Sequence, residues 1–270
     1  GLDSWAVAFN RGPYDYETDE ILRSPHDGAL TREIKRWHLL WRAMRRFDII
    51  HFNFGRSIMP QWDPRSAGAN GAMSSIARAL VRSYATLFEL RDVPWLKRAG
   101  KGIVVTFQGT DARQQDFGLQ NFEISIAGDV GAGPYSPESD ERKRWRIAKI
   151  ARYADRIHAL NPDLLYLLPP DSQFLPYGHV DLRDWQPVRM DDPGPRGPVV
   201  VHAPTDRGVK GTRYILDAVS RLKSEGVELE FILVEGVRQK EARRIYERAD
   251  LLVDQLLAGW YGGLAVELMA

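Results

Sequence analysis

The chain has 270 residues, of which 44% are hydrophobic and 27% are charged, and its formal net charge is +1. This length suits one large or two medium domains, and the composition is ordinary for a globular protein. A net charge so close to zero excludes a global electrostatic attraction to nucleic acid or to a membrane, so any basic site has to be local.

The chain contains no cysteine, which excludes disulfides, thiolate nucleophiles and thiolate metal ligands. A protein without disulfides suits a reducing compartment, and we expect it to be cytoplasmic. No stretch approaches the roughly 20 apolar residues of a membrane span, and no secretory signal opens the chain. The first strand and the last helix both lie hard against the chain ends, so we expect a piece of a longer protein.

Predicted strands and helices alternate through the first 160 residues. The strands are short apolar runs, and the helices show apolar residues at a period of 3.6. In chain order we expect a strand over 4–9, a helix over 30–46, a strand over 47–54, a helix over 74–90, a strand over 101–107, a helix over 141–153 and a strand over 156–160.

The helix over 30–46 carries Ile34, Trp37, Trp41 and Met44 on one face, and we expect this face to lie in the core. In the helix over 74–90 the residues in register are Ile76, Leu80, Tyr84 and Leu87. The strand over 47–54 reads as buried. Residues 111–139 are irregular, and a loop of this length is expected to be functional or mobile.

Three prolines and two glycines within 191–198 interrupt the alternation and predict a linker. After it we expect strands over 199–203, 229–234 and 251–253, and helices over 212–225 and 239–248, with a further helix starting near Gly263. Alternation on both sides of a linker predicts an α/β protein with two parallel-sheet domains, 1–190 and 199–270.

Ligands of such sheets bind outside the carboxyl ends of the strands. This rule selects five segments as candidates for a site. They are His51 to Gly55, Gln108 to Asp111, Asn161, Pro204 to Lys210, and Asp254 to Gly263.

Three stretches of the chain overlap these segments: Lys101-Gly-Ile-Val-Val-Thr-Phe-Gln-Gly-Thr-Asp111, Val201-His-Ala-Pro-Thr-Asp-Arg-Gly-Val-Lys-Gly211 and Gly259-Trp-Tyr-Gly-Gly-Leu-Ala-Val-Glu-Leu-Met-Ala270. In this order they resemble bacterial glycosyltransferase family 4, the retaining GT-B family that transfers sugars from nucleotide donors. The resemblance implies two Rossmann-like domains facing a cleft, an acceptor domain followed by a donor domain. It also implies that the first βα unit and the last βα units are missing.

The resemblance assigns Lys210, with Arg207 as its partner, to the donor diphosphate, where cations stabilise the charge of the leaving nucleotide. Both can instead be solvated loop cations. Glu267 matches the carboxylate that holds the donor ribose, although it can simply complement a helix dipole. The family's other carboxylate falls at position 259, where this chain has glycine, so we expect Asp254 or the backbone over 259–262 to substitute, or donor handling to differ.

The remaining site residues surround these. Gly262, Gly263 and Leu264 would meet the diphosphate with backbone N–H groups, since a helix N-terminus favours anions. Glu235 would lie near the nucleotide base. On the acceptor side or beside the transferred sugar we place Gln108, Gly109, Thr110, Asp111, His51 and Asn53, for which a plain turn or a structural histidine is the alternative. His202, inside an apolar strand, is expected to pack.

The expected partners are a nucleotide-sugar and a glycan, lipid-linked or small-molecule acceptor, with no nucleic acid and no metal or other cofactor. The arginine-rich stretch 141–146 can attract an acidic acceptor or a lipid carrier at the inner membrane surface, or can be a solvated helix face. A sugar-nucleotide epimerase or hydrolase on the same fold remains open, and so does a non-catalytic GT-B-like binding or scaffold protein.

Overall fold

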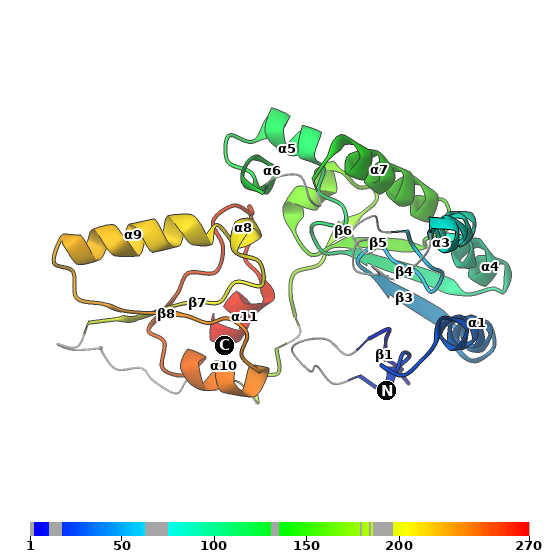
Figure 1. Ribbon diagram of the computed structural model, residues 1–270, viewed down its shortest axis with the longest axis horizontal. Helices are drawn as coiled ribbons and strands as arrows, with labels where there is room; N and C mark the ends of the chain where they lie inside the picture. Colours follow the sequence, from blue (N-terminus) through cyan, green and yellow to red (C-terminus); the bar gives the residue numbers. More distant parts are fainter. Residues whose placement is uncertain are drawn as a thin grey trace.

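A computed structural model describes residues 3–10, 18–62, 75–130, 135–178, 180–183, 185 and 197–269. Within these ranges every paired strand runs parallel to its neighbour. The strands form sheets with the orders β1-β2, β3-β4-β5-β6 and β8-β7-β9 (Figure 1). The predicted α/β class with parallel sheets is therefore confirmed.

The four-stranded sheet is built from β3 (Ile49–Asn53), β4 (Gly102–Phe107), β5 (Arg156–Ala159) and β6 (Gln173–Phe174). Its core lies on β4, where alternate apolar side chains are fully buried. The expectation that β3 is a buried strand is wrong, because Ile49, His51 and Asn53 are exposed. The reason is its place at the edge of the sheet, where the strand has a neighbour on one side only.

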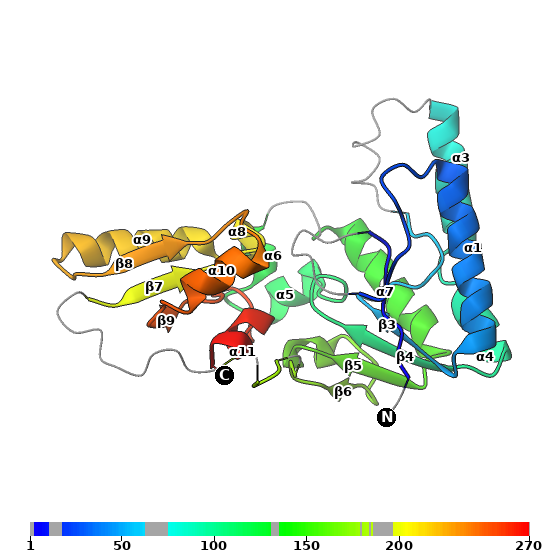
Figure 2. The same cartoon turned by 90° about the horizontal axis from the view of Figure 1, so that it is seen from below.

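Helices pack on this sheet from both sides (Figures 1 and 2). A small parallel pair, β1 (Val7–Ala8) and β2 (Glu20–Ile21), precedes them. The helical elements are α1 (Ala29–Arg46), α3 (Ser75–Phe88), α4 (Asp92–Arg98), α5 (Gln115–Asn121), α6 (Ile126–Asp129), α7 (Pro137–Ala151) and the 3₁₀ helix η1 (Pro162–Tyr166). The predicted irregular stretch 111–139 thus contains two short helices and the start of α7.

The expected core face of α1 is wrong for Ile34, Trp37 and Trp41, which are exposed, whereas Met44 packs against the core as expected. This helix buries Arg36, Leu39, Leu40 and Ala43, whereas Ile34 and Trp41 are 60% and 50% exposed. The sheet and α4 lie against the side of the helix that carries the two adjacent leucines. Helical periodicity finds an apolar stripe, but tertiary packing decides which stripe is covered.

The second larger sheet places β7 (Val199–His202) between β8 (Glu230–Leu233) and β9 (Leu251–Leu252). Its buried core consists of Val199, Val201, Val234 and Ala242. The helices of this part are α8 (Arg207–Lys210), α9 (Thr212–Ser224), α10 (Gln239–Tyr246) and α11 (Gly263–Met269). Among the described helices, none is both long enough and apolar enough to cross a membrane.

The two larger sheets have separate cores and meet through a small contact. Both cartoon views place α6 of the first part beside α8 of the second (Figures 1 and 2). Ile126, Ala127, Tyr135 and Leu257 form an apolar cluster there, and Arg213 pairs with Asp129 at 2.5 Å beside it. Of the predicted linker 191–198, only Gly197 and Pro198 belong to the described residues.

Candidate functional site

Lys210 is the centre of a polar cluster at the carboxyl end of the three-stranded sheet. Its Nζ lies 2.8 Å from Asp254 Oδ1 and 2.8 Å from Gln255 Oε1. The side chains of Lys210 and Asp254 are 13% and 11% exposed, so the ion pair is largely removed from water. A pair with this geometry and burial holds the ammonium group in one place.

Short-range structure fixes the position of the lysine. Asp206 caps α8, with its side chain accepting from the Val209 N–H at 3.0 Å. The helix ends after one turn at Gly211, which has a left-handed φ of 72° that favours glycine. Leu257 packs against Gly211. Lys210 therefore lies on a one-turn helix whose N-terminus is capped by Asp206 and whose C-terminus is fixed by Gly211.

The glycine turn before α11 is tied to the same cluster. The Gly262 N–H donates to Asp254 Oδ2, and Gln255 Nε2 donates to the Trp260 carbonyl. A Cβ at position 262 would lie 2.9 Å from Lys210 Nζ and 3.0 Å from Asp254 Oδ2. Gly262 is needed here because its backbone passes directly beside the ion pair. Gly263 and Leu264 start α11, and Glu267 lies half-buried within it.

Arg207 does not join the Lys210 cluster. Its guanidinium forms a two-point ion pair with Glu235 at the end of β8, with Nε 2.8 Å from Oε1. The Arg207 side chain is 60% exposed, so this pair is open to solvent. The hydrogen bond from Arg207 lowers the pKa of the Glu235 carboxyl group.

The loop after β4 is closed by Asp111. Its carboxylate accepts from the Gly109 N–H at 2.6 Å and from the Gln108 N–H at 3.1 Å. Burial raises the pKa of Asp111, and the two backbone N–H groups oppose that rise. Gln108 Nε2 lies 3.5 Å from Asn53 Oδ1 on β3, whereas Thr110 is exposed. Gln108, Gly109 and Asn53 thus share one corner at the carboxyl edge of the sheet.

An ion pair and a hydrogen bond, neither of which the sequence predicted, also stabilise this corner. Arg113 forms a two-point ion pair with Asp163 at the start of η1, with distances of 2.6 and 3.0 Å. Asn161 Nδ2 donates to the Gln108 carbonyl at 2.6 Å. A Cβ on Gly109 would lie 2.7 Å from Arg113 NH1, so the ion pair packs directly under the loop.

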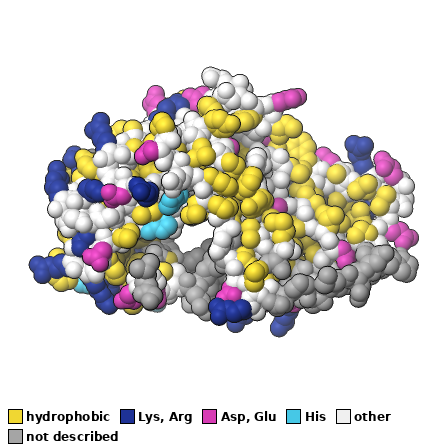
Figure 3. Space-filling model, turned by 180° about the vertical axis from the view of Figure 1, so that it is seen from behind, with side chains coloured by type: hydrophobic (Ala, Val, Ile, Leu, Met, Phe, Trp, Pro, Cys, Tyr) yellow, Lys and Arg dark blue, Asp and Glu magenta, His cyan; other side chains and the backbone are white. Residues whose placement is uncertain are grey.

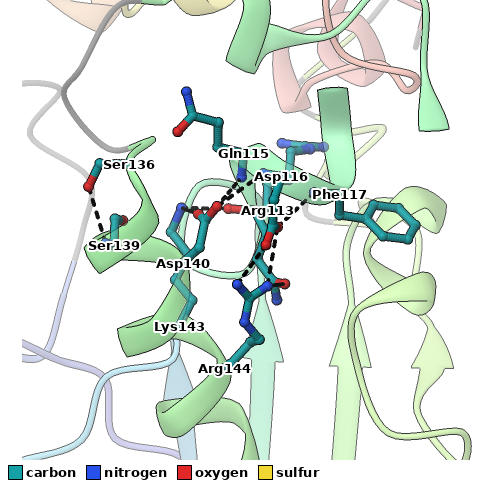
Figure 4. Close-up of polar contacts among 10 residues, drawn as sticks. Arg113, Gln115, Asp116, Phe117, Ser136, Ser139, Asp140, Lys143 and Arg144 are labelled. Carbon is teal, nitrogen blue, oxygen red and sulfur yellow. Dashed lines mark hydrogen bonds and ion pairs between the residues drawn. The ribbon is translucent and has the colours of Figure 1, made fainter. Parts of the chain in front are cut away.

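A buried network on α7 supports α5 from below (Figure 4). Asp140 Oδ2 accepts from the N–H groups of Gln115 and Asp116 at 2.7 and 3.1 Å, which caps the N-terminus of α5. Lys143 is buried beside it, donates to the Arg113 carbonyl and lies under the Tyr135 ring. The stretch 141–146 is therefore not a uniformly solvated helix face, because Lys143 points into the fold.

Tyr177 lies between the two polar corners. Its hydroxyl hydrogen-bonds with Asn161, and its electrostatic neighbours include Asp111 and, from the other sheet, Asp254. Burial raises the pKa of Tyr177. Its ring is 6.3 Å from that of Tyr261, and Phe174 stands edge-on to Trp260 at 5.3 Å. The glycine turn over 259–263 thus faces the carboxyl edge of the first sheet across a wall of aromatic rings.

His51 and His202 have structural partners. His51 Nε2 is 2.7 Å from Thr106 Oγ1 on the neighbouring strand. His202 is fully buried, with Nδ1 2.7 Å from the Val253 carbonyl and Nε2 2.8 Å from Thr212 Oγ1. A carbonyl can only accept, so Nδ1 carries the proton and Nε2 accepts from the threonine hydroxyl. His202 packs in the core, as its apolar strand predicts.

Of the predicted residues, Asp254 and Gly262 gather around Lys210, and Gly263 and Leu264 follow them in the chain at the start of α11. A second group gathers at the β3–β4 corner: Gln108, Gly109, Asp111 and Asn53. Arg207 and Glu235 form their own exposed pair. A search of protein-family models and of curated proteins found no match to this chain. The resemblance to glycosyltransferase family 4 therefore rests on the three sequence segments alone.

Proposed function

We propose that this protein is a GT-B type retaining glycosyltransferase that transfers a sugar from a nucleotide-diphosphate sugar to a hydroxyl acceptor. The observation that carries the proposal is the place of Lys210. An immobilised ammonium group lies at the carboxyl end of one parallel sheet, across an aromatic wall from the polar loop of another. Nucleotides bind α/β sheets at such edges, and a departing diphosphate needs positive charge.

The contacts of Lys210 suit a phosphate oxygen. An ammonium group has three protons, of which Asp254 and Gln255 take two. The third proton has no acceptor among the residues that the structure describes, and it can be donated to a ligand. Asp254 then acts as a positioning residue, because it orients the lysine and holds the Gly262 N–H of the glycine turn.

Arg207 supplies the second cation by exchanging partners. In the exposed pair with Glu235 its guanidinium is already presented in a two-point geometry, which phosphate also accepts. An ion pair this exposed contributes little to stability, so a diphosphate can displace Glu235 at low cost. The two cations would balance the charge that forms on the leaving nucleotide.

The acceptor hydroxyl approaches from the β3–β4 corner. Gln108 is half-buried there and offers its side-chain amide, while the buried Gly109 and the Gln108 backbone are held by Asp111 and Asn161. In the retaining mechanism that the resemblance implies, the departing phosphate takes the acceptor proton, so no separate protein base is required. Glu267 on α11 would accept hydrogen bonds from the donor ribose.

Titration calorimetry against a panel of nucleotide-diphosphate sugars, together with an assay of released nucleotide, tests this function. We expect one donor to bind and to be turned over when a hydroxyl acceptor is present. Failure of every donor to bind would refute the proposal. Binding without turnover, for all acceptors tried, would leave only the sugar-nucleotide binding role.

That binding role, as a non-catalytic GT-B-like scaffold protein, is the second candidate. The observation in its favour is Gly259, which stands where the family has a carboxylate against the donor sugar. A Cβ added at Gly259 would meet no atom within 4 Å, so a glutamate would fit. If Gly259→Glu creates turnover in a protein that binds a donor but does not transfer it, the scaffold role is correct.

A further inference from the structure

An exposed apolar surface runs along α1 and α3, on the side of the first sheet that lies away from the second (Figures 1 and 2). We call it the outer face. On α1 the exposed apolar residues follow one another at intervals of one helical turn, and Leu30 and Trp41 are 75% and 50% exposed. On α3, Ile76 and Leu80 are 73% and 66% exposed. The complete face consists of Leu30, Ile34, Trp37 and Trp41 of α1 and Ile76, Leu80 and Leu87 of α3.

The two rows meet in one surface. Trp37 Nε1 donates to the Tyr84 hydroxyl at 3.0 Å, and the Trp37 ring packs on Phe88 at 5.4 Å. These contacts join the two helices at Trp37, and the two rows extend from there along α1 to Leu30 and along α3 to Ile76. Single exposed apolar residues are normal, but a continuous patch of this kind marks an interaction site.

Charge around the face is strongly one-sided. In a chain of net charge +1, α1 and α3 together carry eight Lys and Arg residues and one acidic residue, Glu33. Arg45, Arg46, Arg78 and Arg82 are exposed, and within the described ranges none of them pairs with a carboxylate. In the view of Figure 3, several basic side chains lie at the end of the molecule that carries these helices.

We propose that the outer face binds the surface of an anionic lipid bilayer. Tryptophan rings prefer the boundary between lipid headgroups and acyl chains, and an apolar stripe with arginines beside it is the composition of helices that lie in that boundary. Arg45 stacks on the Trp41 ring at 5.1 Å, which places a cation directly at the rim of the apolar row. The phosphate groups of anionic lipids would pair with these arginines, which have no carboxylate partner within the described chain.

The probe is co-sedimentation with vesicles of phosphatidylcholine alone and of phosphatidylcholine mixed with phosphatidylglycerol, without nucleotide-sugar. We expect binding to the anionic vesicles only, weakened by salt. Arg45→Gln combined with Arg78→Gln should lower the partition coefficient about fivefold per arginine. Trp41→Ser combined with Leu80→Ser should lower it at least about tenfold.

Matched controls come from α9 in the other sheet, where Leu222 and Arg221 are also exposed. Leu222→Ser combined with Arg221→Gln should leave partitioning unchanged, and circular dichroism should show all variants folded. Absence of binding to anionic vesicles overturns the proposal, and so does binding that Trp41→Ser with Leu80→Ser leaves intact. Concentration-dependent dimerisation that the same double variant abolishes would also overturn it, by assigning the face to a second copy of the chain.

Discussion

At the scale of single residues, the site depends on one ammonium group and on the atoms that hold it. Lys210 is oriented by Asp254 and Gln255, and Asp254 in turn accepts from Gly262. A side chain at position 262 would push the Lys210 ammonium group or the Asp254 carboxylate out of its place. The functional assignment can therefore be tested with substitutions that change charge and keep the fold.

Lys210→Ala should weaken binding of a nucleotide-diphosphate sugar by about 2 kcal/mol, or roughly thirtyfold, because it removes a charged hydrogen bond to phosphate. Titration calorimetry measures the change. Lys223→Ala is the matched control, since Lys223 is an exposed lysine on α9 and should bind donor normally. Equal affinity of the Lys210→Ala and control variants would remove Lys210 from the site.

His202 predicts a pH dependence of stability. Burial lowers its pKa in the folded state, and the hydrogen bond to the Val253 carbonyl only partly opposes this. The unfolded chain therefore binds more protons below its own pKa of about 6.5, so the free energy of unfolding should fall as the pH drops below that value. Urea unfolding at a series of pH values measures the effect.

The control for this measurement is His202→Asn, which retains an N–H donor for the Val253 carbonyl and cannot titrate. Burial also lowers the pKa of His51, so both proteins keep that contribution and their difference isolates His202. A wild-type profile parallel to that of His202→Asn would show that His202 does not titrate abnormally.

At the scale of elements, α7 determines where the β4 loop lies. Its Asp140 caps α5, and its Lys143 holds the Arg113 carbonyl, both from buried positions (Figure 4). Burial of a polar network is costly unless every member has a partner. Asp140 Oδ1 has no hydrogen-bond partner in the described structure and lies 3.7 Å from Lys143 Nζ, so the carboxylate is held by the lysine on one oxygen and by two N–H groups on the other.

Asp140→Ala should lower the free energy of unfolding by about 3 kcal/mol, because it removes a buried carboxylate that pairs with Lys143 and accepts from two N–H groups at the start of α5. Asp116→Ala is the control. Its carboxylate forms an exposed pair with Arg144, and loss of such a pair costs less than about 1 kcal/mol. Chemical denaturation measures the free energy of unfolding of both variants. Equal decreases would show that the buried Asp140 network stabilises the fold no more than an exposed ion pair does.

At the scale of the whole molecule, the two larger sheets touch through few side chains. Leu257 follows β9 and packs with Tyr135 and Ile126 of the first part. Burial raises the pKa of Tyr135 to about 12, and its hydroxyl has no hydrogen-bond partner in the described structure. Small contacts of this kind between α/β units allow relative motion.

Leu257→Ala should destabilise this contact by about 2 kcal/mol through the lost apolar burial and the cavity left behind. Hydrogen exchange should then quicken in α6 and α8 while β4 and β7 stay protected. Leu256→Ala, a neighbouring leucine that is 47% exposed, should leave the exchange unchanged. Faster exchange in β4 as well would mean that the contact supports the whole fold.

Much of the element order could be predicted from the sequence, because strand length, helical period and the glycine and proline positions are local properties. The helices over 30–46 and 212–225 and the strands over 101–107 and 199–203 all appear close to their predicted bounds. The partner of Arg207 could not be predicted, since Glu235 lies on another strand. Nor could the pairing of Arg113 with Asp163, which joins residues 50 positions apart.

The sequence by itself therefore determined the α/β class, the strand ends where a site can form, and the residues Lys210, Asp254 and Gly262 as members of one site. Local patterning and the direction of parallel strands suffice for these. Only the tertiary structure decided which helical stripes are buried. Trp41 and Leu80 lie on stripes that periodicity marks as apolar, but the sheet packs against another side of α1 and barely covers α3. Burial depends on neighbours distant in the chain, and a repeating pattern does not specify them.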